Sequence, residues 1–594
     1  FDSLSGMFGE YEWLTTTEAD HVVSDFGSGL DKIYSTYVTN ARNLAGQQQP
    51  LGIYSRSRAE WLLAELSAFY TRRYSVGISD SASVEQFESS VNETGLQVVL
   101  CSIDKVPRML ERIKSTPGIK VIISMDRLDC SKPNTATQTF NIVSTSELKS
   151  KADALDVALM DMDQVIEIGR INPARPIPPR PSDISTICYT AGTTGKPRAV
   201  VITHAAFAYA VHATYLSLAL HNAVYLSCVP LHLVADRHNV YALMHGMVRV
   251  GFSSGNTSED MFADMQKLRP TIVFALPQQL RSVYAEVVAA TTAASGLSGI
   301  LSRIGLSIKM ANYRKGKGLK HPLWDRLAFK DVVQRFGGSL QTLIIGYSVL
   351  QPQVHDFFRA TLSCNVIHRY GLTELAGGGI MQSCEDPSTG SIGVPQPGID
   401  VCLRSVPSVG YNVTDTPCPR GVLLVRSQSV SLADGCQASS MDEEWLATGD
   451  IARFNADGSF TIIDRLSSIV ALSSGGHAAL GHLESIYSAH PALDAVVACV
   501  EEHGHELAAI AVPNPHEFVA WARKVDPGGS VADLRDLCAN RIVAAAMAEE
   551  LNSLAMKEGV AKTQRLGSVY LMPSMLGQAT GSVFTETFSV RRGL

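Results

Sequence analysis

The sequence predicts an α/β protein, in which a large N-terminal domain of mainly parallel sheets with packed helices precedes a smaller α+β domain. Short apolar runs rich in β-branched residues recur along the chain, and helix-like stretches separate most of them, as in parallel α/β sheets. With 594 residues the chain is long enough for more than one domain. The runs predicted as strands are Leu51–Ser55, Gln97–Ser102, Lys120–Met125, Ile184–Cys188, Ala223–Pro230, Thr271–Leu276, Thr342–Gly346 and Asn365–Tyr370.

The composition narrows the classes of function. Hydrophobic residues make up 45% of the chain, and the formal net charge is −7, so we expect no nucleic-acid partner. None of the 11 cysteines lies in a Cys-x-x-Cys pair, which argues against zinc and redox motifs and favours buried thiols in a reducing compartment. No uninterrupted apolar run reaches the roughly 18 residues of a transmembrane helix. The chain begins at Phe1 rather than Met, which leaves a preceding anchor or targeting peptide open.

Local signals define several elements of the first domain. Ser83 and Gln86 form a Ser-x-x-Gln capping box, which predicts the start of a helix. Asn172–Ser182 contains five prolines and no apolar periodicity, and we therefore expect an extended linker there. Asn455–Gly458 has the residues of a hairpin turn.

A second, smaller unit is expected from Asp464 onwards. It contains the apolar runs Ala495–Val500 and Leu507–Pro513, and a long alanine-rich helix is predicted from about Asp533 to Met556. We predict two domains, at residues 1–464 and 465–594.

The segment Tyr189–Arg198 carries the strongest chemical signal. It follows an apolar run, and its glycines and threonines supply backbone N–H groups and hydroxyls of the kind that surround phosphate. Lys196 adds a positive charge, but Pro197 follows it where a Walker loop has Ser or Thr. The candidate phosphate-binding residues are Thr190, Gly192, Thr193, Thr194, Gly195 and Lys196.

This segment resembles the phosphate loop of the adenylate-forming (AMP-binding) superfamily, Tyr-Thr-Ser-Gly-Thr-Thr-Gly-x-Pro-Lys-Gly. Tyr11–Thr15, Gly52–Ser55, Arg58–Trp61 and His321–Leu327 are similar to stretches of its long-chain acyl-CoA synthetase branch, so the resemblance covers essentially the whole chain. It implies the adenylate-forming fold with a mobile C-terminal lid. It also implies ATP-dependent conversion of a medium-to-long fatty acid to acyl-AMP and then acyl-CoA, with ATP, Mg²⁺ and CoA as cofactors.

The same resemblance assigns roles to further residues. In Tyr370-Gly371-Leu372-Thr373-Glu374 it implies that Tyr370 stacks on adenine, Thr373 touches the α-phosphate and Glu374 holds Mg²⁺, and a carboxylate at the end of a strand suits a hard cation. Asp450 is the implied ribose clamp, and Arg465 of the Asp464-Arg465 hinge the implied nucleotide contact. The remaining implied residues are Gly346, Tyr347 and Gly371 for the nucleotide, Gly475 and Gly476 for CoA, and Glu374, Thr194 and the position of Ser589 for catalysis.

Four departures from the family pattern lie along one reaction path. Ser589 stands where the family has its catalytic lysine, and loss of one such preorganised donor typically costs roughly 10²–10³ in rate. Tyr347 stands where the family has alanine, and its phenol either fills part of the nucleotide site or turns outward. Leu466–Ser468 replaces the hinge sequence Lys-Lys-Asp, and Ala191 replaces a serine of the phosphate loop.

Two interpretations therefore stay open. The chain is either an active fatty acyl-CoA synthetase or a non-catalytic protein on the same fold, which binds nucleotide or acyl chains or serves as a subunit of a larger assembly. His232, in a segment similar to one near the family's acyl site, is more often a structural residue than a catalytic one. Tyr313–Lys320 is basic enough for anionic lipid, although a solvated loop is the simpler interpretation, so peripheral membrane association and assembly partners stay open. We expect an intracellular protein, in the cytoplasm or on an organelle such as the mitochondrion, endoplasmic reticulum or peroxisome.

Overall fold

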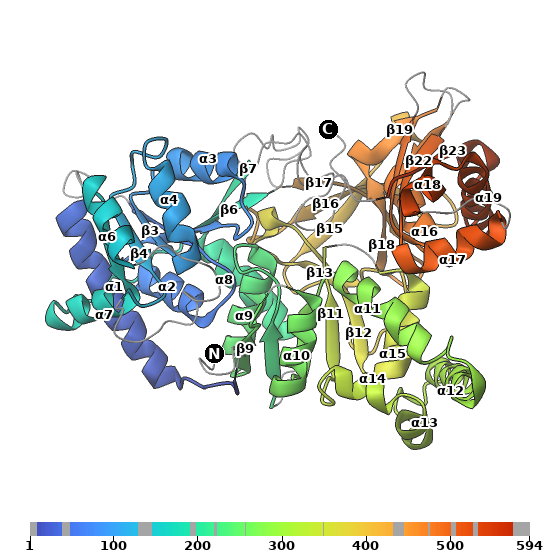
Figure 1. Cartoon of the computed structure of the whole chain (residues 1–594), viewed down its shortest axis with the longest axis horizontal. Coiled ribbons are helices and arrows are strands. Elements are labelled where there is room, and N and C mark those ends of the chain that lie inside the picture. The colour runs from blue at the N-terminus through green and yellow to red at the C-terminus, as the bar shows by residue number, and fades with distance from the viewer. Residues whose placement is uncertain are drawn as a thin grey trace.

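The computed structural model describes most of the chain. The described residues are 9–38, 48–128, 145–190, 198–218, 222–255, 257–347, 350–431, 445–472, 476–500, 507–526 and 533–573. Figure 1 shows two large sheets side by side, a smaller sheet next to them and a C-terminal unit at one end. The predicted α/β architecture is confirmed.

The first sheet has the strand order β5-β4-β3-β1-β2-β6-β7, and every neighbouring pair is parallel except β6 and β7. Its central strands are buried along nearly their whole length, as parallel strands covered by helices are. The strands are β1 Pro50–Tyr54, β2 Tyr74–Ile78, β3 Val98–Cys101, β4 Val121–Ser124, β5 Ala158–Asp161, β6 Ile184–Thr190 and β7 Arg198–Thr203. The helices are α1 Thr16–Tyr37, α2 Ala59–Tyr70, α3 Val84–Thr94, η1 Ile103–Lys105, α4 Val106–Arg112, α6 Thr145–Ala154, α7 Met162–Ile171 and α8 His204–Ser217.

Two local predictions for this region are confirmed. The Ser83 hydroxyl accepts from the backbone N–H of Gln86 at 3.2 Å, and the Gln86 side chain accepts from the backbone N–H of Ser83 at 2.8 Å, so the capping box starts α3. The segment after α7 has no helix or strand until β6, as expected of the proline-rich linker.

The second sheet has the order β14-β13-β12-β11-β10-β8-β9, parallel from β9 to β12 and antiparallel beyond. Its strands are β8 Val224–Ser227, β9 Arg249–Phe252, β10 Ile272–Ala275, β11 Thr342–Ile345, β12 Asn365–Gly371, β13 Gly379–Met381 and β14 Val394–Pro395. Its helices are α9 Val234–His245, α10 Ser258–Leu268, α11 Pro277–Ala290, α12 Gly296–Arg314, α13 Pro322–Leu327, α14 Lys330–Arg335 and α15 Pro352–Leu362, and the short turn η2 Thr373–Leu375 follows β12.

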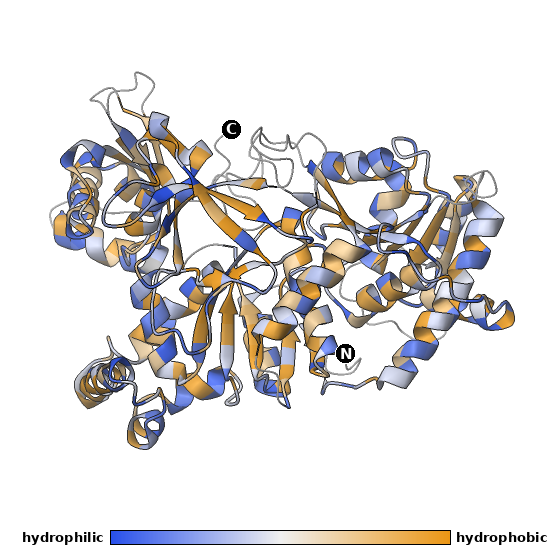
Figure 2. Cartoon of the chain, turned by 180° about the vertical axis from the view of Figure 1, so that it is seen from behind, coloured by the Kyte–Doolittle hydropathy of each residue, from blue (hydrophilic) through white to orange (hydrophobic). Residues whose placement is uncertain are grey.

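One hydrophobic core joins the two sheets. Ile53 and Val98 of the first sheet belong to the same buried cluster as Tyr225, Phe274 and Ile344 of the second. Figure 2 shows the hydrophobic colour concentrated along the strands of both sheets. The two sheets are therefore packed as parts of one body.

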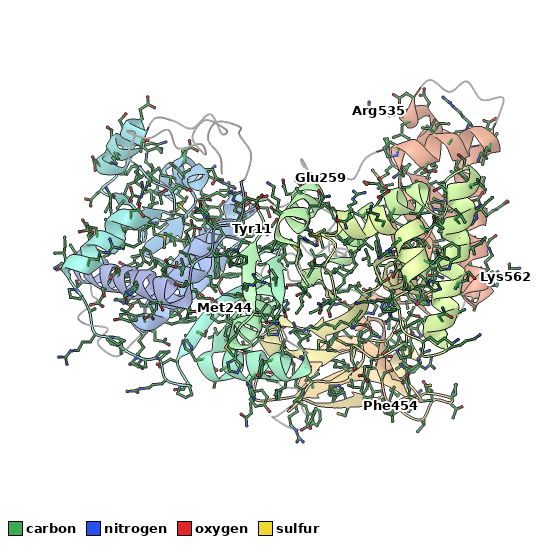
Figure 3. The ribbon with its side chains drawn as sticks, turned by 90° about the horizontal axis from the view of Figure 1, so that it is seen from below. Tyr11, Met244, Glu259, Phe454, Arg535 and Lys562 are labelled. Carbon is green, nitrogen blue, oxygen red and sulfur yellow. The ribbon has the colours of Figure 1, made fainter. Side chains whose placement is uncertain are left out.

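A third, antiparallel sheet follows in the order β15-β16-β17-β18. The short turn η3 lies between β15 and β16. Phe454, the last residue of β17, is labelled in Figure 3. The Asn455 N–H donates to the Ser459 carbonyl at 2.8 Å and Gly458 has φ +86°, which confirms the predicted hairpin turn. The elements are β15 Asp400–Arg404, η3 Pro407–Val409, β16 Arg420–Arg426, β17 Leu446–Phe454 and β18 Phe460–Arg465.

The C-terminal part has a hydrophobic core of its own and the sheet β21-β22-β23. The elements are η4 Leu466–Ser468, β19 Ile469–Ala471, β20 His477–Ala479, α16 Leu480–Tyr487, β21 Leu493–Val500, β22 Leu507–Pro513, α17 Pro515–Val525, α18 Leu534–Ala539, α19 Arg541–Lys557, η5 Lys562–Gln564 and β23 Leu566–Leu571. The division into domains at residues 464 and 465 stays a prediction.

The single long helix predicted from Asp533 to Met556 is wrong. The structure has two helices, α18 and α19, because Asn540 is extended (φ −77°, ψ 116°) and its side chain accepts from the Ile542 N–H at 2.9 Å. Asn540 thus begins a new helix in place of continuing the old one. Among the helices of the described residues, none is long and apolar enough to cross a membrane.

Candidate functional site

The predicted phosphate-binding segment is framed by two paired strands. β6 and β7 run antiparallel, and Thr190 lies opposite Arg198 at the end of the pair. The Thr190 hydroxyl donates to the Arg198 carbonyl at 3.4 Å. Gly192, Thr193, Thr194, Gly195 and Lys196 lie outside the described residues, so their role stays a prediction.

Three of the predicted nucleotide residues meet beside the third sheet. Tyr370, at the end of β12, donates its hydroxyl to Asp450 Oδ2 at 2.6 Å, and Arg465 Nε lies 3.3 Å from Asp450 Oδ1. β17 and β18 pair so that Asp450 faces Arg465 directly. Only 5% of the Asp450 side chain is exposed, against 51% for Arg465, so the carboxylate lies under a guanidinium that faces solvent.

The electrostatics of this group depend on burial. Burial raises the pKa of the Asp450 carboxyl above its usual value, and Arg465 and the Tyr370 hydroxyl oppose that rise. Burial, together with the nearby carboxylate, raises the pKa of Tyr370 well above its ordinary value, so the phenol stays a hydrogen-bond donor at neutral pH. This triad, Tyr370–Asp450–Arg465, presents a hydrogen-bond acceptor and a positive charge at one place.

The turn after β12 carries the other predicted residues of this motif. Thr373 and Glu374 belong to η2, which contacts β7, the strand that follows the phosphate segment. The Glu374 carbonyl accepts from the Ser431 N–H at 2.7 Å, which fixes the backbone of the turn. A Cβ at Gly371 would lie 2.9 Å from the carbonyl oxygens of Gly377 and Gly378, so the close return of the chain requires glycine there.

Tyr347 is partly buried and packs against the core, whereas its place in the nucleotide site stays a prediction. It follows β11 with φ +68°, and its ring packs on the core beside Phe274, with 6.3 Å between the ring centroids. Burial raises the pKa of its phenol. Gly346 before it has no room for a side chain, because a Cβ would lie 2.4 Å from the Phe274 ring.

A buried ion pair, which the sequence analysis did not identify, lies behind this region. Arg237 Nη1 and Glu65 Oε1 are 2.7 Å apart, and the exposed fractions of the two side chains are 0% and 1%. The guanidinium also donates to the Thr186 hydroxyl at 2.8 Å and to Cys188 Sγ at 2.7 Å, and Tyr241 donates to the carboxylate at 2.9 Å. Glu65 lies among apolar residues of α2, and no sequence motif connects it with Arg237, which is 172 positions later in the chain.

The residue before Arg237 is a buried acid. Asp236 accepts from the Ser227 hydroxyl at 2.6 Å and from the Tyr225 hydroxyl. Burial raises the pKa of Asp236 to about 6. Asp236 and Arg237 thus take separate partners, although they are adjacent in the chain.

Arg369 is a second buried cation that the sequence analysis missed. It precedes Tyr370 on β12, is 5% exposed, and donates to Asn239 Oδ1, to the Gly377 carbonyl and to the His238 ring. Its Nε has no acceptor among the described residues, and burial lowers the pKa of its guanidinium to about 9. The sequence did contain a sign of this buried cation, because Arg369 is a charged residue within the run that was predicted as a strand, Asn365–Tyr370.

The predicted hinge residue Asp464 is tied to the C-terminal part. Its Oδ2 accepts from the backbone N–H groups of Gly481 at 2.7 Å and His482 at 3.2 Å, at the first turn of α16. Gly476 of the glycine motif is exposed with φ +88°, and no hydrogen bond or ion pair between described atoms joins it to the triad. Gly475 and Ser589 lie outside the described residues.

His232 is 8% exposed and lies against β2. A Cβ at Gly77 would come within 3.1 Å of the His232 Cα, so the backbone packs closely there. The close packing is that of a structural residue.

The donor set of the triad and η2 fits a nucleotide with its magnesium ion. A carboxylate can accept from vicinal hydroxyls and a guanidinium can pair with phosphate, and Glu374 would supply an oxygen ligand of the kind that Mg²⁺ shares with phosphates. Within the described ranges, no cluster of three or more His, Cys, Asp or Glu side chains could hold a metal ion.

Known proteins resemble this chain both in sequence and in fold. The family model described as AMP-binding enzyme matches residues 4–433. Long chain acyl-CoA synthetase 6, a peroxisomal protein of Arabidopsis thaliana, is 28% identical over 99% of this chain and 80% of its own length. The peroxisomal acyl-CoA ligase 891 of Penicillium brevicompactum is 31% identical over 82% of this chain and 69% of its own. Long-chain-fatty-acid–CoA ligase 5 of Mus musculus is 27% identical over 98% of this chain and 82% of its own.

Solved structures share the fold. The adenylation domain of a carboxylate reductase from Mycobacterium chelonae has a TM-score of 0.78 at 18% identity, over 98% of this chain and 82% of that domain. The corresponding domain from Segniliparus rugosus, in complex with AMP and a co-purified carboxylic acid, has a TM-score of 0.74 at 19% identity, over 98% of this chain and 85% of that one. The chain thus adopts the adenylate-forming fold, and with the family model matched over most of its length it belongs to the AMP-binding enzyme family.

Proposed function

We propose that the chain is an ATP-dependent fatty acid–CoA ligase with a weakened first step. In that step a carboxylate oxygen of the acid attacks the α-phosphorus of ATP and pyrophosphate leaves. The CoA thiol then attacks the acyl carbonyl carbon, loses its proton, and AMP leaves. The observation that carries the proposal is the Tyr370–Asp450–Arg465 triad, in which a shielded carboxylate, a phenol and a cation converge next to the Thr373–Glu374 turn.

Each residue has a chemical task in this proposal. Asp450 would accept from the ribose hydroxyls, Tyr370 would offer its ring to adenine, and Arg465 would pair with ribose or phosphate. Thr373 and Thr190–Lys196 would contact the phosphates. Mg²⁺ held by Glu374 would supply positive charge to the phosphate oxygens. Gly475 and Gly476 would line the approach of CoA, and residues 465–594 would form the lid.

The weakness of the first step follows from Ser589. A serine hydroxyl carries no charge to stabilise the negative charge that develops between the carboxylate and the α-phosphate. Loss of one preorganised donor of this kind typically costs about 10²–10³ in rate. We therefore expect slow acyl-adenylate formation, while nucleotide binding is kept.

A non-catalytic nucleotide-binding protein is the second candidate function. The partly buried Tyr347 and the buried Arg369 favour it, because they bring a phenol and a cation to the ends of β11 and β12. A phenol and a cation at this point are poor neighbours for a buried hydrocarbon chain.

Pyrophosphate release separates the two functions. The purified chain is incubated with ATP, Mg²⁺ and palmitate, beside Ser589→Lys and the matched control Ser589→Ala. Slow, acid-dependent release that rises roughly 10²-fold or more in Ser589→Lys supports the ligase. Wild-type and Ser589→Ala rates should be equal.

Nucleotide binding completes the test. Saturable ATP binding by calorimetry without pyrophosphate release in the wild type or in Ser589→Lys would establish the binding protein. Absence of both binding and release would refute both functions.

A further inference from the structure

Helix α12 packs on the protein with its small and polar side. Gly299, Ser302, Gly305 and Lys309 are buried, at spacings that put them on one face. A Cβ at Gly305 would lie 2.9 Å from the ring of Trp324 on α13, so the two helices are in close contact. A glycine contact and polar groups thus hold this helix, together with Leu306, which packs against the core.

An ion pair fixes the same contact. The Lys309 ammonium pairs with the Asp325 carboxylate and donates to the Ser363 hydroxyl at 2.6 Å, and its side chain has no exposure. The cost of burying this lysine is offset by the acid and the hydroxyl. α12 is therefore anchored in one rotational setting about its own axis.

In that setting the aliphatic side of α12 faces solvent. Its exposed residues recur every three or four positions and form a stripe along the helix. α13 adds two exposed leucines one turn apart. The exposed fractions are Leu297 78%, Ile300 46%, Ile304 44% and Ile308 37% on α12, and Leu323 59% and Leu327 55% on α13.

The same segment is strongly basic. Residues 296–330 contain eight Lys and Arg and one acid, Asp325, although the whole chain has a net charge of −7. All the bases except Lys309 are exposed. Figure 1 shows α12 and α13 at an outer corner of the molecule, and Figure 2 shows hydrophobic residues on both helices there. The bases are Arg303, Lys309, Arg314, Lys315, Lys317, Lys320, Arg326 and Lys330.

We propose that the α12–α13 surface docks on an anionic lipid bilayer, with α12 lying in the plane of the interface. An exposed aliphatic stripe flanked by Lys and Arg is the pattern of helices that insert at the boundary of headgroups and acyl chains. Anionic headgroups attract the surrounding bases. A second copy of this chain is a poor occupant, because a two-fold contact would set the same positive charge against itself.

Vesicle binding tests the proposal on the full chain. We compare sedimentation with vesicles of phosphatidylcholine alone and of phosphatidylcholine mixed with phosphatidylserine, at low and high salt. We expect binding to the mixed vesicles only, and weaker binding at high salt. The double variant Lys315→Gln/Lys317→Gln should bind about fivefold more weakly for each charge removed.

Matched variants distinguish binding through the α12–α13 surface from non-specific binding of the protein to vesicles. Ile304→Gln should lower binding at least fivefold, whereas Ile542→Gln, which changes an exposed isoleucine of α19, should not. Lys557→Gln/Lys562→Gln removes two exposed lysines of the C-terminal part, with Lys562 labelled in Figure 3, and should leave binding unchanged. Circular dichroism of each variant checks the fold.

Several outcomes would overturn the proposal. These are equal binding to neutral and anionic vesicles, no binding to either, or equal losses in the test and control variants. Concentration-dependent self-association that Ile304→Gln abolishes, measured by analytical ultracentrifugation without vesicles, would identify a second copy as the occupant instead.

Discussion

Glu65 of α2 and Arg237 of α9 form an ion pair, with 2.7 Å between Oε1 and Nη1, that is closed off from solvent and joins helices of the two large sheets. Removal of one partner leaves the other charge buried and unpaired. We expect Glu65→Gln to lower the free energy of unfolding by about 3–5 kcal/mol. Urea denaturation followed by circular dichroism measures this loss.

Glu60→Gln is the matched control on the same helix. Its carboxylate pairs with Arg58 but is 35% exposed, so the loss should stay within about 1 kcal/mol. The double variant Glu65→Gln/Arg237→Met should lose less than the sum of the two single losses, because both charges are then gone. Additive losses would contradict the pairing.

A second prediction concerns the triad. Asp450→Asn removes the charge that Arg465 faces and weakens the acceptor of the Tyr370 hydroxyl. If Asp450 holds a ribose, affinity for AMP measured by calorimetry should fall about tenfold or more. Glu259→Gln, which changes an exposed carboxylate of α10 labelled in Figure 3, is the control for the change of net charge. Equal affinity in wild type and Asp450→Asn would remove Asp450 from the site.

A third prediction concerns acid stability. His368 of β12 is buried, its Nε2 accepts from the Leu350 N–H at 3.0 Å, and burial lowers its pKa to about 4. An unfolded histidine titrates near about 6.5, so between pH 6.5 and 4 the unfolded chain binds a proton that the folded chain does not. This group alone should reduce stability by about 3 kcal/mol as the pH falls through that window.

His368→Asn removes this dependence and keeps a side chain that can accept from the backbone. The difference between variant and wild-type unfolding free energies, from urea titrations at pH 7 and pH 4.5, should shift in favour of the variant at the lower pH. A difference that does not change with pH would show that His368 titrates normally in the folded protein.

A fourth prediction tests the packing at the end of β11. Gly346→Ala should lower stability by about 1–3 kcal/mol, because its Cβ would lie 2.4 Å from the Phe274 ring. The clash is with a side chain, so Phe274→Leu should make Gly346→Ala less costly than it is in the wild-type background. Thermal unfolding midpoints of the four proteins complete the cycle, and equal costs in both backgrounds would exclude the clash as the cause.

The sequence predicts the elements that local signals define. The capping box at Ser83 and the turn at Asn455–Gly458 need only neighbouring residues, and both form as expected. The break at Asn540 is local too, but an alanine-rich pattern continues on both sides and hides a single capping residue. Strand order and the antiparallel edge strands depend on pairings between distant segments, which no local signal reports.

For the candidate site, the motifs predict which residue types are present, but not where their side chains point. Tyr370, Asp450 and Arg465 come from three strands, and their meeting depends on how β12 lies beside the third sheet. The direction of Tyr347 depends on a positive φ and on Phe274, 73 positions earlier in the chain. The partners of Arg369 include Asn239 and His238 of α9, which lie 130 and 131 positions away in the chain, so no local pattern connects them.

Asp464 limits how the C-terminal part can turn. Its carboxylate accepts two backbone hydrogen bonds from the first turn of α16, and a Cβ at Gly481 would come within 2.6 Å of that carboxylate. Any rotation of α16 away from β18 has to break both bonds, each worth about 1.5–3 kcal/mol to a charged acceptor. These two hydrogen bonds therefore restrain rotation at the junction. A ligand that rotates the C-terminal part has to supply the free energy that breaks them.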